Sequence, residues 1–171
     1  MSRKLHLLPF EFQKAFIIGG QANLSVLSKL TGKWLAFFIM NPTRRNEDLS
    51  HLRFVYTRTS EPSNGFFGTI FLNEPNTPFR TSRKAKIPFN DIHITAFHWI
   101  WQQMVSEIPM KDAELYHVNL CGRCGYTLTD PPSIVTGFGT HCRKELGLRT
   151  LGRKELRSLG YNINTKGEYT P

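Results

Sequence analysis

Cysteine is scarce in this sequence: the chain has 3 cysteines among 171 residues, and all of them lie between positions 121 and 142. Three clustered thiols cannot form the disulfide framework that stabilises many small secreted domains. This usage is typical of a reducing compartment, and we therefore expect a cytoplasmic protein.

Long apolar runs are also missing. No segment approaches the roughly 18 consecutive apolar residues that a membrane span needs. The apolar residues at the N-terminus are interrupted by Pro9, Glu11 and Lys14, and no small-residue cleavage site follows them. We expect neither a signal peptide nor a membrane partner.

The common catalytic signatures are absent. The sequence has no P-loop, no G-x-S-x-G, no H-E-x-x-H and no paired-carboxylate pattern. Gly19-Gly20 follows a predicted strand, and no helix pattern begins there, so a turn or bulge is favoured over a phosphate-binding loop. Nothing in the sequence supports an enzyme, although missing motifs do not exclude one.

Acidic residues are few relative to basic ones: 13 Asp and Glu stand against 22 Lys and Arg, giving a formal net charge of +9. Such a balance favours a polyanionic partner, either nucleic acid or an acidic protein face. The candidate phosphate-binding residues are Arg80, Arg83, Lys84, Lys86, Arg123, Arg143, Lys144, Arg153 and Lys154. Arg123, inside the cysteine loop, is the sharpest single candidate.

The cysteines have the spacing of a metal site. Cys121 and Cys124 form a C-x2-C pair, and Cys142 follows after seventeen residues. Zn²⁺ takes four tetrahedral thiolate and imidazole ligands, and a C-x2-C loop supplies two of them from one turn. Free thiols and a redox pair are the competing interpretations. The turn-forming residues at 127–132 favour zinc over a thioredoxin-like strand-helix unit.

The fourth ligand can come from either of two histidines. His117 precedes the loop by four residues, and His141 directly precedes Cys142. Side chains of neighbouring residues diverge on a strand and on a helix, so His141 and Cys142 converge poorly on one ion. We therefore predict a closed, structural zinc site formed by His117, Cys121, Cys124 and Cys142, with His141 as the alternative to His117.

The segment around these cysteines resembles a known domain. Cys121-Gly122-Arg123-Cys124-Gly125, followed by Leu128-Thr129, Pro131, Ser133-Ile134, Gly137, Gly139 and Cys142, is similar to a small zinc-finger-like domain of unknown function that is common in bacteriophage and prophage proteins. The likeness covers about residues 117–145, and Tyr126 and Thr140-His141 depart from the usual pattern. The resemblance implies a phage-type protein acting in the cytoplasm of a bacterial host, and it implies no particular activity.

The chain pattern predicts an α+β fold in which an antiparallel sheet carries one packed helix. Strands are expected at 12–18, 22–27, 34–40, 52–59, 66–72 and 111–120. The continuous apolar run at 34–40 predicts a central strand buried on both faces, with Trp34, Phe37, Phe38 and Ile39 mostly buried. The helix begins at Asn90 or Asp91 and is expected to turn Ile92, Ala96, Trp99, Ile100 and Met104 toward the sheet.

After the sheet we expect a treble-clef-like zinc module and then an amphipathic basic helix at 148–159. Within the module, Gly122 and Gly125 allow a tight turn with positive φ, and a short helix should begin at Asp130-Pro131 and end at Gly137. The predicted organisation is an α+β domain at 1–112, a zinc-binding module at 113–147, and a basic helix and tail at 148–171. We hypothesise a zinc-binding accessory protein that binds DNA or RNA through its basic surfaces. The alternative is a protein that inhibits or modulates an acidic host protein by contact, without catalysis.

Overall fold

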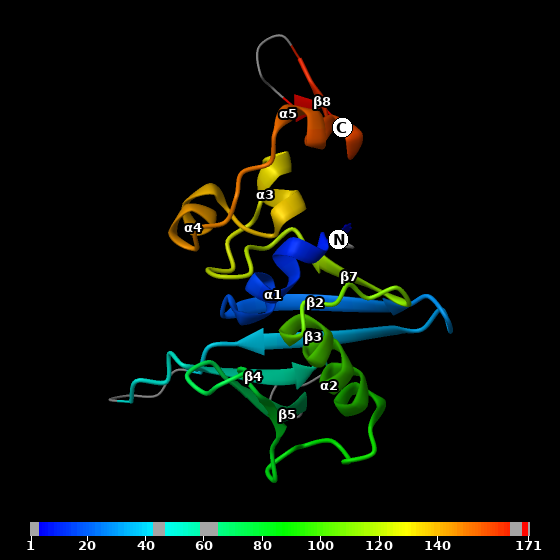
Figure 1. The fold of residues 1–171 in the computed structure, drawn as a ribbon, viewed down its shortest axis with the longest axis vertical. Helices are drawn as coiled ribbons and strands as arrows, with labels where there is room; N and C mark the ends of the chain where they lie inside the picture. Colours follow the sequence, from blue (N-terminus) through cyan, green and yellow to red (C-terminus); the bar gives the residue numbers. More distant parts are fainter. Residues whose placement is uncertain (1–3, 43–46, 59–64, 165–168, 171) are drawn as a thin grey trace.

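A computed structural model of the chain describes residues 4–42, 47–58, 65–164 and 169–170. Its centre is a seven-stranded sheet with the order β1-β7-β2-β3-β4-β5-β6, in which every neighbouring pair is antiparallel (Figure 1). The strands are β1 (Leu5–Leu7), β2 (Gln21–Ser28), β3 (Trp34–Met40), β4 (Leu52–Thr57), β5 (Phe66–Phe71), β6 (Phe79–Thr81) and β7 (Ala113–Val118). The predicted α+β class is confirmed at this level.

The segment at 12–18 is a helix and not the predicted strand. Helix α1 spans Phe10–Ile18 and buries Phe12, Phe16 and Ile17. These residues are spaced by four and five positions, so a helix collects them on one face, whereas a strand would divide them between two. A short apolar run does not distinguish the two states by its pattern alone, and packing on the sheet selected the helix.

Helix α2 (Ile92–Val105) begins where the sequence predicts, because Asp91 accepts a hydrogen bond from the backbone N–H of His93. The predicted buried face is partly wrong. Ile92 and Trp99 are 55% and 42% exposed. The residues that this helix buries are Ile94, Phe97, Ile100, Trp101 and Met104.

Both helices lie in front of the sheet in Figure 1, where α1 crosses β2 and α2 crosses β3 and β4. The strand β3 is central, as predicted, but only one of its faces is fully buried. Phe37 and Ile39 are 1% and 0% exposed, whereas Trp34 on the opposite face is 49% exposed and Phe38 is partly exposed. We call this second surface of the sheet, away from α1 and α2, the open face.

The rest of the chain forms short elements beyond the sheet: α3 (Pro131–Thr136), α4 (Thr140–Glu145), α5 (Arg153–Ser158), β8 (Asn162–Ile163) and β9 (Tyr169–Thr170). Asp130 caps α3 by accepting from the Ser133 N–H, and Gly137 ends that helix with a φ of 77°. The predicted basic helix at 148–159 is reduced to the six residues of α5.

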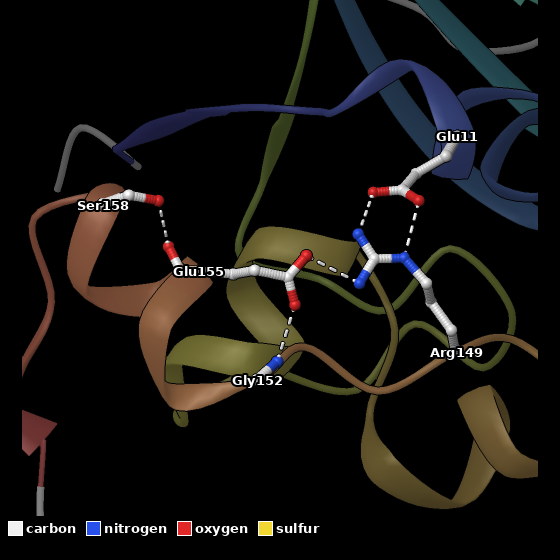
Figure 2. A network of polar contacts seen from close by, with 5 residues as sticks. All are labelled: Glu11, Arg149, Gly152, Glu155 and Ser158. Atoms are coloured by element: carbon white, nitrogen blue, oxygen red, sulfur yellow. Dashed lines mark hydrogen bonds and ion pairs between the residues drawn. The ribbon is translucent and has the colours of Figure 1, made fainter.

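Arg149 fixes the segment before α5 to helix α1 (Figure 2). Its Nε and Nη2 donate to the two carboxylate oxygens of Glu11 at 2.7 and 2.6 Å, and its Nη1 lies 2.7 Å from Glu155 Oε1. Glu155 also accepts from the Gly152 N–H at 2.8 Å, at the N-terminus of α5. Hydrogen bonds to Glu11 and Glu155 raise the pKa of Arg149. This arginine therefore holds the chain in place and is not a free cation.

The exposure of the two faces predicts different responses to truncation in β3. Phe37→Ala should lower the free energy of unfolding by about 3–5 kcal/mol, because it leaves a cavity between the sheet and α2. Phe38→Ala should cost at most about 2 kcal/mol, since its ring lies on the open face. Urea denaturation of both variants measures the difference, and equal losses would contradict the one-sided burial.

Candidate metal centre

The cysteine loop is a tight hairpin that continues from β7. The Cys121 N–H donates to the Tyr126 carbonyl at 2.8 Å, and the Gly125 N–H donates back to the Cys121 carbonyl at 2.9 Å. Gly125 has a φ of 76°, a conformation that suits glycine. This turn presents the side chains of Cys121 and Cys124 together, as the C-x2-C spacing predicts.

The third thiol arrives from helix α4. Gly139 precedes this helix with an extended φ of −61° and ψ of 155°, and Cys142 lies in its first turn. The ligand atoms of Cys121, Cys124 and Cys142 all lie within 4.8 Å of one another. Cys124 Sγ and Cys142 Sγ are 3.6 Å apart. That separation is close to the S···S distance of about 3.8 Å that tetrahedral Zn–S geometry gives, and far above the ~2.05 Å of a disulfide.

The thiols influence one another's ionisation. Burial raises the pKa of Cys121, but backbone N–H groups of Cys124, Gly139 and Arg123 outweigh it and lower the pKa overall. Burial, a hydrogen bond with Cys124 and the neighbouring Cys121 raise the pKa of Cys142 to about 12. The thiolate form of Cys121 is thus favoured, and that of Cys142 is opposed, as expected when close thiols compete to ionise.

His117 does not lie in this group. Its side chain is 0% exposed and belongs to the core face of β7. Nδ1 lies 2.6 Å from the Val118 carbonyl oxygen, and Nε2 lies 2.7 Å from the Ile134 carbonyl oxygen. A neutral imidazole has one N–H and donates to one of these two carbonyl oxygens at a time. Both nitrogens face the backbone of β7 and α3 and neither faces the thiols. This geometry argues against the predicted role of His117 as the fourth ligand.

His141 is placed differently. Its side chain is 84% exposed, and its Nε2 lies 3.5 Å from Glu145 Oε1, too far for a firm hydrogen bond. No histidine or carboxylate among the described residues joins the three thiols. Cys121 and Cys142 are buried while Cys124 is exposed, so the group opens to solvent on the Cys124 side.

Arg123 forms an ion pair with Glu145. This contact joins the cysteine loop to the last turn of α4, and so helps to hold the two parts of the thiol group together. Arg123, predicted as the sharpest nucleic-acid contact, therefore forms an intramolecular ion pair at the surface.

The other predicted cations divide by their surroundings. Arg143 is only 5% exposed, and its Nη1 lies 3.4 Å from Thr136 Oγ1, so this conformation does not present it to a phosphate. Arg80 donates to both carboxylate oxygens of Glu74 at 2.7 and 2.5 Å and stacks on Phe71. The predicted cations that are exposed and form no ion pair with another described residue are Arg83, Lys84, Lys86, Lys144, Arg153 and Lys154.

The sequence reasoning missed a set of aromatic residues beside three of these cations. Phe54, Tyr56 and Phe66 line a hollow together with Arg83, Lys84 and Lys86. The alternating pattern of 52–59 was the available signal, since it places Phe54 and Tyr56 on the same face of a strand. Their exposure depends on which face the helices leave open, and the pattern does not contain that information.

Comparisons with known protein families, with curated proteins and with solved structures found no match for this chain. Among the described residues, no helix combines the length and apolar character required to cross a lipid bilayer.

The environment of His117 predicts a pH-dependent stability. Burial lowers its pKa below 6.5, against the opposing effect of the two carbonyl groups. The folded state then binds this proton less well than the unfolded state, so the contribution to stability is present above pH ~6.5 and is lost as the pH falls through the lowered pKa. Burial also lowers the pKa of His6 and of His98, and these act in the same direction.

Urea denaturation of the protein as purified, between about pH 7.5 and pH 5.5, measures this effect, and the metal content determined at each pH detects any metal release. The free energy of unfolding should decrease toward pH 5.5. The variant His117→Leu should show a weaker dependence than the wild type. A free energy that stays constant or rises on acidification would be inconsistent with the buried neutral imidazole.

Proposed function

We propose that this protein binds nucleic acid through exposed cationic side chains, and that its cysteines hold a structural zinc ion. The observation that carries the proposal is that six of the predicted cations are exposed and form no ion pair with a described residue, in a chain of formal net charge +9. Unpaired surface cations attract the phosphate backbone and release its counterions on binding. Cations already paired with carboxylates contribute much less.

The donor set supports zinc. Three thiolates suit Zn²⁺, and they come from a tight hairpin and from the first turn of a helix, an arrangement similar to a treble-clef finger. Zinc would supply the folding energy that a segment of this size cannot obtain from its apolar contacts. It would also neutralise the thiolates, which otherwise repel one another.

For the fourth coordination position we propose His141 in place of His117. The group opens to solvent near Cys124, and His141 is exposed and free of firm hydrogen bonds. Moving His117 would instead break two short contacts in the core.

The spacing of residues 121–142 also supports our proposal that the chain is a phage-type accessory protein of the bacterial cytoplasm. In the hairpin, Gly125 adopts the left-handed conformation that the pattern requires, and Asp130 and Gly137 begin and end α3 at the expected positions. The proposal concerns the kind of protein and assigns it no host target.

Metal analysis tests the site. The wild type, purified without chelator, should retain about one zinc ion per chain, and Cys121→Ser should retain none, because the substitution removes one of the four ligands that a closed tetrahedral site needs. His141→Ala should weaken retention, while His117→Ala should keep the zinc and lower the melting temperature. Elemental analysis gives the stoichiometry, and Co²⁺ substitution reports the ligand set.

Two results would change this assignment. Loss of zinc from His117→Ala with full retention in His141→Ala would restore His117 as the ligand. A wild-type protein without metal, carrying a disulfide between two of the three cysteines, would replace the zinc site with a redox pair.

Nucleic-acid binding is tested by fluorescence anisotropy with labelled DNA and RNA. Affinity should fall steeply between about 50 and 200 mM salt, and each phosphate-binding cation that is removed should reduce the slope of log K against log salt by about 1. Arg80→Gln, a cation already paired with Glu74, is the matched control and should change the slope little.

The alternative partner gives a different outcome. If the protein binds no nucleic acid at low salt, and instead a stoichiometric acidic protein remains bound after nuclease treatment, then the cations serve a protein contact. That result would overturn the proposed function.

A further inference from the structure

Four aromatic rings form a continuous cluster on the open face. The ring centroids of Phe38 and Tyr56 are 6.2 Å apart, those of Tyr56 and Phe66 are 5.4 Å apart, and those of Phe54 and Phe66 are 5.3 Å apart. They come from the adjacent strands β3, β4 and β5, in which Phe38 is paired with Tyr56 and Tyr56 with Phe66. All four side chains are only partly buried.

A cationic segment borders this cluster. After β6 the chain continues alongside β5: the Ser82 N–H donates to the Phe67 carbonyl at 2.9 Å, and the Lys86 N–H donates to the Phe66 carbonyl at 2.7 Å. Between these two bonds the chain makes a turn, in which the Lys84 N–H donates to Ser82 Oγ at 3.1 Å. The backbone therefore holds the cations of this turn beside the aromatic cluster.

The cluster and the turn enclose one open hollow of about 630 Å³. Its lining residues are Phe54, Tyr56, Phe66, Arg83, Lys84, Ala85 and Lys86. None of these carries a carboxylate. Within the described residues Arg83, Lys84 and Lys86 are exposed and form no ion pair, whereas nearby Arg80 is neutralised by Glu74. The site therefore offers positive charge to an occupant from outside the chain.

We propose that this hollow binds single-stranded nucleic acid, with bases stacked on Tyr56, Phe66 and Phe54 and phosphates contacting Arg83, Lys84 and Lys86. The inference rests on the proposed function and names its site and its substrate class. Aromatic rings and cations in one groove are the combination that single strands use, because every base has a π-face and every nucleotide a phosphate. The bases of a duplex are already stacked on one another, so they cannot lie on these rings.

The location separates this site from the other exposed cations. Helix α5 lies at one end of the long axis of the molecule and β5 lies toward the other end (Figure 1). Charge reversal at Arg153 and Lys154, in α5, removes the same charge far from the hollow, and it is therefore compared with charge reversal at Arg83 and Lys84 for its effect on the ratio of strand to duplex binding. Tyr126, which is 79% exposed in the cysteine loop, is the matched control for the aromatic positions.

The experiment measures anisotropy with a 12-nucleotide mixed-sequence oligomer as DNA, as RNA and as the corresponding DNA duplex. The single strands should bind more tightly than the duplex. Tyr56→Leu and Phe66→Leu should each weaken single-strand binding about 5- to 150-fold, the range that stacking of one base gives. The pair Arg83→Glu and Lys84→Glu should also weaken it and should reduce the preference for single strands over the duplex. Arg153→Glu with Lys154→Glu should weaken strand and duplex by a similar factor and keep that preference, and Tyr126→Leu should have little effect. Comparison of the DNA and RNA arms identifies the preferred strand.

Photo-crosslinking on the wild type keeps the test independent of variant stability. A strand carrying 5-bromouracil (DNA) or 4-thiouracil (RNA) should crosslink to peptides that contain Tyr56 or Phe66. Crosslinks confined to the cysteine loop or to α5, or equal binding of strand and duplex unaffected by the aromatic variants, would overturn this inference while leaving the proposed function intact. Failure of the wild type to bind any of the three oligomers would remove both.

Discussion

Packing of the Phe16 ring against two glycines connects helix α1 and the sheet to the cysteine segment. A side chain on Gly122 or on Gly137 would place its Cβ only 2.6 Å from Phe16 Cδ2, so neither position has room for one. The same ring packs on Phe138 and on His117, with centroids 5.8 and 5.2 Å away. Gly122 follows the first cysteine but has no positive φ in this structure. Glycine is therefore needed at position 122 because the Phe16 ring packs closely there, and not because the turn requires a positive φ.

This packing also explains why His117 is unavailable as a ligand. Once α1 lies on the sheet, the side chain of His117 is enclosed between Phe16 and the backbone of α3, and its two nitrogens face the carbonyl groups of Val118 and Ile134. The three thiols are then left with one open side. The cysteine hairpin is fixed to α1 by the close approach of Gly122 to the Phe16 ring, so the thiol group and the core support each other.

Ion pairing divides the basic residues into two groups, those paired with a carboxylate and those without one. Arg149, Arg123 and Arg80 each lie against a carboxylate and serve the fold. The cations of the turn at 82–86 form no ion pair with a described residue, and they border the open face of the sheet. Because α1 and α2 pack on the other face, Phe54, Tyr56 and Phe66 remain partly exposed.

The sequence by itself determined the local features. The C-x2-C hairpin, the cap at Asp91, the boundaries of α3, the strand at 34–40 and the α+β class all follow from short-range backbone chemistry, which acts within a few residues and is written in their order. Only the tertiary structure decided that 10–18 is a helix, which face of β3 is open, that His117 belongs to the core, and which cations are free. These features depend on contacts between residues far apart in the chain, such as Glu11 with Arg149 or Phe16 with Gly137. A local pattern contains no information about such partners, because the packing of a side chain depends on residues that are distant in the sequence.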